Sequence, residues 1–184
     1  MKLTRYLLLL LLPLVAFVPP TIWQPFAIDK QVAVQVPTPP SEANIDKLAT
    51  AHYYSPTRVW TSKAPEGAYF IIRTAGKASE SIGRQNSAQR QALYSSIIQA
   101  ALQSDQGELL TRTSFSTPGG AGCEVKYKGT HPLTQRRVVK YLRYLVVDSI
   151  GYSFQFLPAN PYDSLGLAGA EQRRRFFNSI TVKP

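Results

Sequence analysis

Four consecutive β-favouring segments constrain what this sequence can fold into more than any other feature. They cover residues 108–117, 123–128, 137–147 and 152–156, and apolar and charged residues alternate in the second of them. A glycine-rich turn separates the first two segments, and residues 148–151 form a turn between the last two. The sequence therefore predicts two successive hairpins, which belong in an antiparallel sheet.

Two helices and several short strands complete the predicted fold. The apolar residues between 87 and 103 recur at spacings of three to five, as in an amphipathic helix, and Ser164 can cap a second helix from Leu165 to Phe177. Shorter strands are predicted at 32–36, 68–74 and 180–182, whereas 45–63 stays ambiguous. The predicted fold class is α+β: a central antiparallel sheet flanked by helices, a two-layer or three-layer sandwich, preceded by a hydrophobic leader.

The leader occupies residues 1–28, before a single α+β domain at 29–184. Lys2 and Arg5 precede a stretch from Tyr6 to Ile28 that contains no charge. This pattern is typical of a signal peptide or an N-terminal membrane anchor, and both alternatives stay open. It predicts that the domain lies outside the cytoplasm, in the periplasm, secreted, or held at the membrane by the leader. Lipid attachment is excluded because the only cysteine is Cys123.

Charge narrows the classes of partner. The 184 residues carry a net charge of +10, and removing Lys2 and Arg5 leaves 19 basic residues against 11 acidic ones, or +8. Outside the cytoplasm, such an excess favours an anionic surface or an acidic envelope protein, and it disfavours nucleic acid as the partner. With one cysteine, the domain has no internal disulfide and depends on its core for stability.

A basic strip across the two neighbouring strands 123–128 and 137–147 is the candidate partner-binding surface. Lys126 and Lys128 alternate with the apolar residues of 123–127, so we expect them on the outer face of the sheet. Arg137 and Arg143 share one parity on the next strand and extend this face. Lys140 has the opposite parity and breaks the pattern.

The sequence contains no set of residues typical of a catalytic, cofactor or metal site. The two histidines, His52 and His131, lack metal-ligand spacing with each other or with Cys123. A nucleophilic pair of Cys123 and His131 is conceivable, but Cys123 shares the inward parity of its strand neighbours. Tyr53, Tyr54 and Trp60 are interpreted as core residues rather than as the lining of a ligand groove.

The order of elements resembles the PsbP-like superfamily over roughly Gln31 to Pro184. The resemblance rests on the segment Pro118 to Tyr127, on the Tyr-x-Phe strand at 152–154, and on the ending Arg-Arg-Phe-Phe-Asn-Ser-Ile-Thr-Val at 174–182. That superfamily includes extrinsic photosystem subunits, a Ran-binding import factor and exported bacterial domains. The resemblance implies a central antiparallel sheet between helices and a noncatalytic binding or assembly role.

These observations together predict a nonenzymatic exported domain that binds another cell-envelope component. The alternative is a small-molecule or lipid carrier with a pocket between the sheet and the helices, which predicts a sizeable apolar cavity.

Overall fold

The computed structural model describes residues 22–43, 57–75, 87–131, 134–148 and 150–183. Strands within these residues form two antiparallel sheets, a large one with the order β3-β4-β5-β9-β8-β7-β6 and a small one with the order β1-β2-β10. The large sheet contains β3 (Ser41–Ala43), β4 (Thr57–Ala64), β5 (Gly67–Ala75), β6 (Glu108–Thr117), β7 (Gly120–Thr130), β8 (Arg137–Val147) and β9 (Ile150–Pro158). The small sheet contains β1 (Gln24–Ala27), β2 (Val32–Val36) and β10 (Thr181–Val182), and the helices are α3 (Ser87–Ser104) and α4 (Ala170–Asn178).

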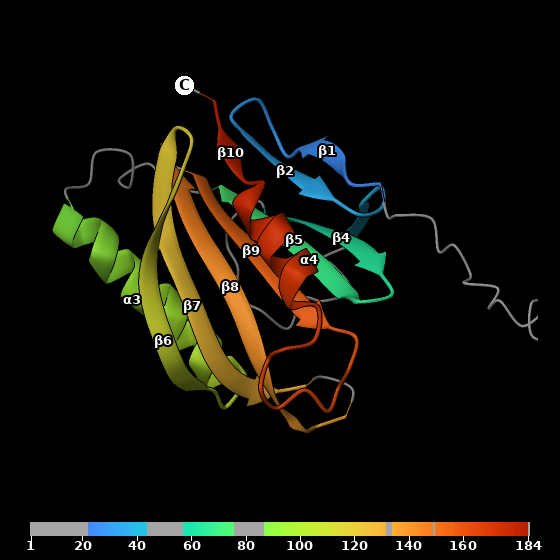
Figure 1. The fold of residues 1–184 in the computed structure, drawn as a ribbon. Coiled ribbons are helices and arrows are strands. Elements are labelled where there is room, and N and C mark those ends of the chain that lie inside the picture. Colours follow the sequence, from blue (N-terminus) through green and yellow to red (C-terminus); the bar gives the residue numbers. More distant parts are fainter. Residues whose placement is uncertain (1–21, 44–56, 76–86, 132–133, 149, 184) are drawn as a thin grey trace, which may run out of the picture.

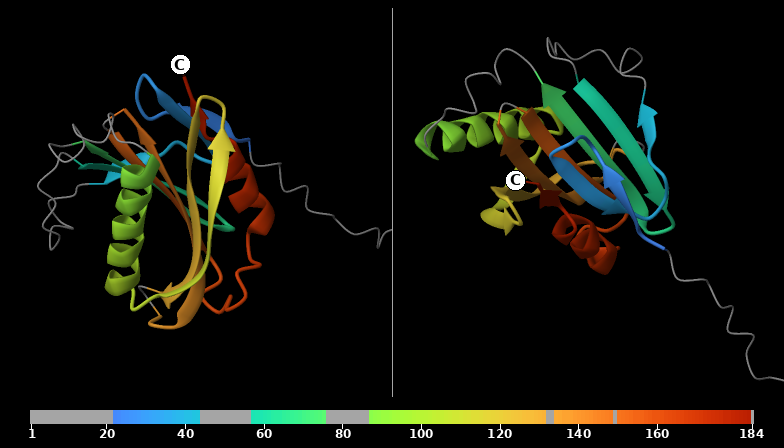
Figure 2. Two further views of the ribbon diagram at one scale, coloured as in Figure 1. Left: turned by 90° about the vertical axis from the view of Figure 1, so that its left-hand side faces the viewer. Right: turned by 90° about the horizontal axis from the view of Figure 1, so that it is seen from above.

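The elements stack in three layers, with the large sheet in the middle (Figure 1). Helix α3 covers one face of this sheet, whereas α4 and the small sheet cover the other (Figure 2). Each face has its own apolar core: Tyr94 and Ile98 of α3 pack on one side, and Phe176 of α4 packs on the other. The predicted α+β sandwich is confirmed, in its three-layer form.

Strand β8 shows why the sheet lies between two cores. Its residues read as an almost continuous apolar run, which is typical of a strand that is buried on both faces. Val139 and Leu145 point into the core shared with α4, and Leu142 and Tyr144 point into the core shared with α3. The pairs β6–β7 and β8–β9 are the two hairpins predicted from the sequence.

The last helix begins later than predicted. We expected it to start at Leu165 with Ser164 as its cap, but α4 starts at Ala170. The carboxylate of Asp163 accepts backbone hydrogen bonds from Gly166, Leu167 and Ala168 instead, at 2.7–3.0 Å. These bonds hold residues 163–168 in a compact loop, and the positive φ values of Gly166 and Gly169 keep it out of the helical conformation.

Residues 24–27 form a strand that the sequence did not predict. They fall within the range 1–28 assigned to the leader, yet they pair with β2 as β1. The folded domain therefore includes at least Gln24. Residues 1–21 of the leader, and Tyr53 and Tyr54, lie outside the described residues. None of the helices within the described residues is long and apolar enough to cross a membrane.

Asp29 ties the small sheet to the large one. Its carboxylate pairs with Arg73 of β5 at 2.8 Å and accepts a hydrogen bond from the Tyr152 hydroxyl of β9 at 2.6 Å. The backbone N–H groups of Gln31 and Val32 also donate to it. Burial opposes ionisation of Asp29, but the hydrogen bonds outweigh burial and lower its pKa below the ordinary value.

The replacement Asp29→Asn is expected to lower the free energy of unfolding by about 2 kcal/mol at neutral pH, because charged hydrogen bonds are lost. The folded-state pKa lies below the unfolded one, so this stabilisation is present above about pH 4 and is lost as the pH falls through the folded-state pKa. Urea denaturation should show the difference between wild type and variant shrinking below about pH 4. Glu171→Gln, at an exposed position, should leave the pH dependence nearly unchanged; a constant difference for Asp29→Asn would contradict the assignment.

Candidate functional site

The four predicted partner-binding residues project from one face of the large sheet, the face that is covered by α4. Lys128 is paired with Val139 across the β7–β8 ladder, and Lys126 is paired with Tyr141. Val139 and Tyr141 belong to the α4-side core, so Lys126 and Lys128 share that side. Arg137 and Arg143 have the same parity as Val139 and Tyr141. Lys140 points the other way and pairs with Asp105 at 2.5 Å.

Arg143 differs from the other three because an ion pair and two aromatic rings enclose its guanidinium. Arg137 also has a partner within the chain, because it donates to the Gln106 carbonyl oxygen at 2.5 Å. The Arg143 guanidinium pairs with Glu124 at 2.5 Å and donates to the Phe177 carbonyl oxygen at 2.7 Å. It also lies over the rings of Phe115 and Phe177, with 4.6 and 5.0 Å between its Cζ and the ring centroids. Only 14% of the side chain is exposed. We therefore assign Arg143 to the joint between α4 and the sheet, not to a binding surface.

Lys126 is joined by a cation that the sequence analysis missed. The Arg173 guanidinium of α4 lies 3.5 Å from the centroid of the Tyr141 ring, and Lys126 Nζ lies 5.6 Å from the same centroid. Arg173 belongs to the basic run Arg173–Arg175, which the sequence places on a helix without indicating which member turns toward the sheet. The packing of α4 on β8 brings these two cations together.

A group of cations on this side of the molecule lacks acidic partners. The ion pairs found within the described residues are Arg58–Glu42, Arg73–Asp29, Lys140–Asp105 and Arg143–Glu124. We define the basic face by five residues that take part in none of them: Lys126, Lys128, Arg136, Arg137 and Arg173. Burial lowers the pKa of Arg173, and the electrostatic effects of Tyr141, Glu124 and Asp163 offset this only in part. An external anion would offset the mutual repulsion of these cations and the cost of burying the charge of Arg173.

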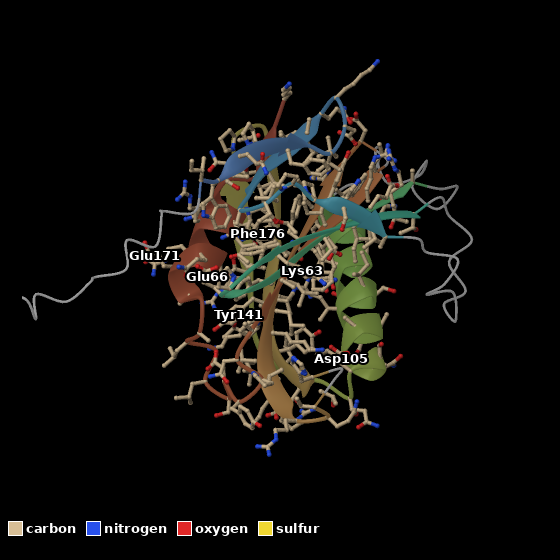
Figure 3. The ribbon with its side chains drawn as sticks, turned by 90° about the vertical axis from the view of Figure 1, so that its right-hand side faces the viewer. Lys63, Glu66, Asp105, Tyr141, Glu171 and Phe176 are labelled. Carbon is tan, nitrogen blue, oxygen red and sulfur yellow. The ribbon has the colours of Figure 1, made fainter. Side chains whose placement is uncertain are left out.

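The opposite face holds a small pocket beside α3. Its volume is about 200 Å³, and its lining includes Phe70, Leu142 and Leu157 together with Asp105 and Lys140. Asp105 lies at one end of α3, on the other side of the sheet from α4 and Phe176 (Figure 3). The Asp105 carboxylate accepts hydrogen bonds from Lys140 and from the Tyr127 hydroxyl, both at 2.5 Å.

This pocket does not favour the carrier alternative. Sites for small molecules usually enclose about 300 Å³ or more. The charged groups in the pocket already satisfy one another, and burial together with the Asp105 hydrogen bond raises the pKa of Tyr127, which keeps its phenol protonated. Within the described residues, the two cores are filled by side chains rather than by an apolar cavity large enough for a lipid.

Cys123 and His131 do not come together as a nucleophile and base. Cys123 is buried near the start of β7, and His131 follows the last residue of the same strand. Eight residues of extended strand separate them by about 26 Å. Burial, with the charge of Lys140, lowers the pKa of His131. No three His, Cys, Asp or Glu side chains gather into a metal-binding group within the described part of the chain.

The three-layer architecture identifies the fold as PsbP-like. The chain is similar to cyanobacterial PsbP (CyanoP) from Synechocystis sp. PCC 6803, whose solution structure matches with a TM-score of 0.56 and 11% sequence identity. The match covers 94% of this chain and 99% of that chain. No protein-family model and no curated protein sequence matches the chain. The resemblance read from the sequence is thus confirmed at the level of the fold, and a fold alone does not fix a function.

Proposed function

We propose that this chain is an exported accessory or assembly domain that acts by binding, and that its basic face binds an anionic component of the cell envelope. The observation that carries the proposal is the cluster of cations around Tyr141, which lacks acidic partners within the described residues. Each Lys or Arg near an anionic surface contributes about 1 kcal/mol to binding. Five such residues would together supply a strong electrostatic attraction to an anionic surface.

The sequence supports a location outside the cytoplasm. Lys2 and Arg5 before an uncharged stretch favour export, with the basic end left in the cytoplasm. The leader also offers a route to membrane association if it is retained. The likeness of the fold to cyanobacterial PsbP supports a noncatalytic accessory role.

The proposal predicts that reversing two charges of the basic face removes the bound component. We expect native mass spectrometry of the full chain, purified from its host envelope, to show a bound mass that Lys126→Glu with Lys128→Glu lowers at least about tenfold. Neither lysine takes part in an ion pair within the described residues, so the variant should stay folded. The mass of the denatured chain reports whether the leader is retained.

Lys30→Glu with Lys183→Glu is the matched control for charge. Both lysines are exposed, and Lys183 bonds to Gln31, whose side chain reaches Asp148 in the β8–β9 turn. This turn is at the opposite end of the large sheet from the β7–β8 connection. The control variant should keep the bound mass. Equal retention by both variants, or a wild-type chain without a bound mass, would remove the basic face from consideration.

A further inference from the structure

Exposed apolar side chains gather at one end of the large sheet. Five of the six large apolar side chains that are exposed within the described residues belong to two segments at this end: Leu109, Leu110, Tyr162, Leu165 and Leu167. The register places the start of β6, the β7–β8 connection and the end of β9 at the same edge of the fold. We call this edge the loop end; it lies opposite the C-terminal strand (Figure 1).

Leu165 and Leu167 are the most exposed of the five, at 68% and 67%. They belong to the loop 159–169 between β9 and α4, which stands out from the body beside the β7–β8 connection (Figure 2). Exposing two leucines so fully to water forfeits the free energy that their burial would supply, about 1.5–3 kcal/mol for each side chain. A scatter of single exposed leucines is ordinary, but a pair in one short loop indicates a surface that becomes covered.

Hydrogen bonds hold the loop in one conformation. The exposure of the two leucines is therefore not the result of a loose chain. Asp163 is buried and accepts hydrogen bonds from three backbone N–H groups of the loop. The Tyr141 hydroxyl donates to the Gly166 carbonyl oxygen at 3.1 Å, and Arg173 donates to the same oxygen at 3.0 Å. A Cβ at Gly166 would lie 2.8 Å from Val139, so the loop packs directly on β8. The fold thus presents Leu165 and Leu167 in a fixed geometry.

Cations of the basic face lie on and beside the loop that carries these leucines. Arg136 lies over the ring of Tyr162, with 4.5 Å between its Cζ and the ring centroid. Arg173 bonds to Gly166, which stands between Leu165 and Leu167. Lys128 and Arg137 lie at the same edge, where Glu108 is an exposed carboxylate paired across the ladder with Lys128. Asp163 is the one carboxylate in the loop 159–169, and its oxygens are bonded to the backbone.

We propose that the loop end docks on the surface of a lipid bilayer that contains anionic headgroups. Leu165 and Leu167 enter the boundary between headgroups and acyl chains, Tyr162 lies at the level of the headgroups, and the basic face contacts lipid phosphates. This rests on the proposed function and names the anionic component as lipid. Protruding apolar tips with cations beside them match the layers of a bilayer, which deforms around them, whereas a protein partner would need a shaped pocket for each leucine.

The test uses a fluorophore at position 167 of the full chain. Cys123 is buried, so a cysteine introduced by Leu167→Cys can be labelled selectively with an environment-sensitive dye. The labelled chain is reconstituted into vesicles of phosphatidylglycerol with phosphatidylethanolamine, or of phosphatidylcholine alone. We expect a several-fold rise in emission and quenching by shallow nitroxide lipids in the anionic vesicles. The same dye at Lys30→Cys is the matched control for insertion by the leader, and its emission should not change.

Two variants separate this inference from the proposed function. Lys126→Glu with Lys128→Glu should lower the dye response at position 167 at least about tenfold. Leu165→Ser in the labelled chain should lower it about tenfold while leaving thermal unfolding unchanged, because Leu165 is exposed. If the emission of the dye at position 167 does not rise when anionic vesicles are present, the lipid assignment is overturned. If the native chain then still carries a protein bound through the basic face, the proposed function stands with a protein partner.

Discussion

Replacing Phe176 with alanine is expected to lower the free energy of unfolding by about 3–5 kcal/mol. The side chain of Phe176 is fully buried, and its ring lies 5.1 Å from that of Tyr69 and 6.2 Å from that of Phe154. It is thus the main contact through which α4 packs on the large sheet (Figure 3). Alanine would leave a cavity beside the rings of Tyr69 and Phe154 that cannot close without moving the helix. Urea denaturation followed by circular dichroism measures the loss.

A milder substitution at the same position shows whether the loss of stability comes from the cavity or follows from any replacement of Phe176. Phe176→Leu keeps an apolar side chain of similar length and should cost about 1–2 kcal/mol. A loss below about 1 kcal/mol for Phe176→Ala would show that α4 is not docked as described. Because Arg173 lies on the same helix, Phe176→Ala should also weaken binding by the basic face, and Phe176→Leu should not.

The hairpins could be predicted from local pattern, because strand alternation has a fixed period of two, whereas a core on each face of the sheet was left open. Val125 and Tyr127 are buried as their parity required, and Trp60 is a core residue. Two strands gave no usable signal. β3 spans only Ser41–Ala43 and depends on pairing with β4, whereas β1 continues an uncharged stretch that reads as part of the leader.

The start of α4 could not be predicted because a side chain competes with the helix for the same backbone groups. Ser164 is a good capping residue, but the carboxylate of Asp163 reaches the N–H groups of Gly166 to Ala168 first. Sequence periodicity does not show which of two neighbouring polar residues will bond to the backbone. The result is the loop that exposes Leu165 and Leu167.

The candidate site was predicted in part. Parity correctly placed Lys126, Lys128, Arg137 and Arg143 on one face and Lys140 on the other. Parity says nothing about what covers that face, so it missed Arg173, which α4 brings to Tyr141. For the same reason it grouped Arg143 with exposed cations, although Glu124 and two phenylalanine rings enclose its guanidinium.

Arg143→Ala is expected to lower the free energy of unfolding by about 3 kcal/mol, the second-largest effect we predict. The substitution leaves Glu124 without its cation, removes the charged donor to the Phe177 carbonyl oxygen, and removes a flat group that lies over two rings. Lys126→Ala, on the same face, should change stability by less than about 0.5 kcal/mol. Chemical denaturation of the two variants side by side tests whether these cations have different roles.

Arg143→Lys and Glu124→Gln divide the contribution of Arg143 into its parts. Lysine keeps the charge but cannot reproduce the planar guanidinium that lies over Phe115 and Phe177, so we expect it to recover less than half of the lost stability. Glu124→Gln should cost about 1–2 kcal/mol, because Arg143 then stays largely buried without a counter-charge. If Arg143→Ala instead left stability intact and reduced binding as strongly as Lys126→Glu with Lys128→Glu, Arg143 would belong to the basic face after all. The joint between α4 and the sheet would then depend on Phe176 and its aromatic neighbours alone.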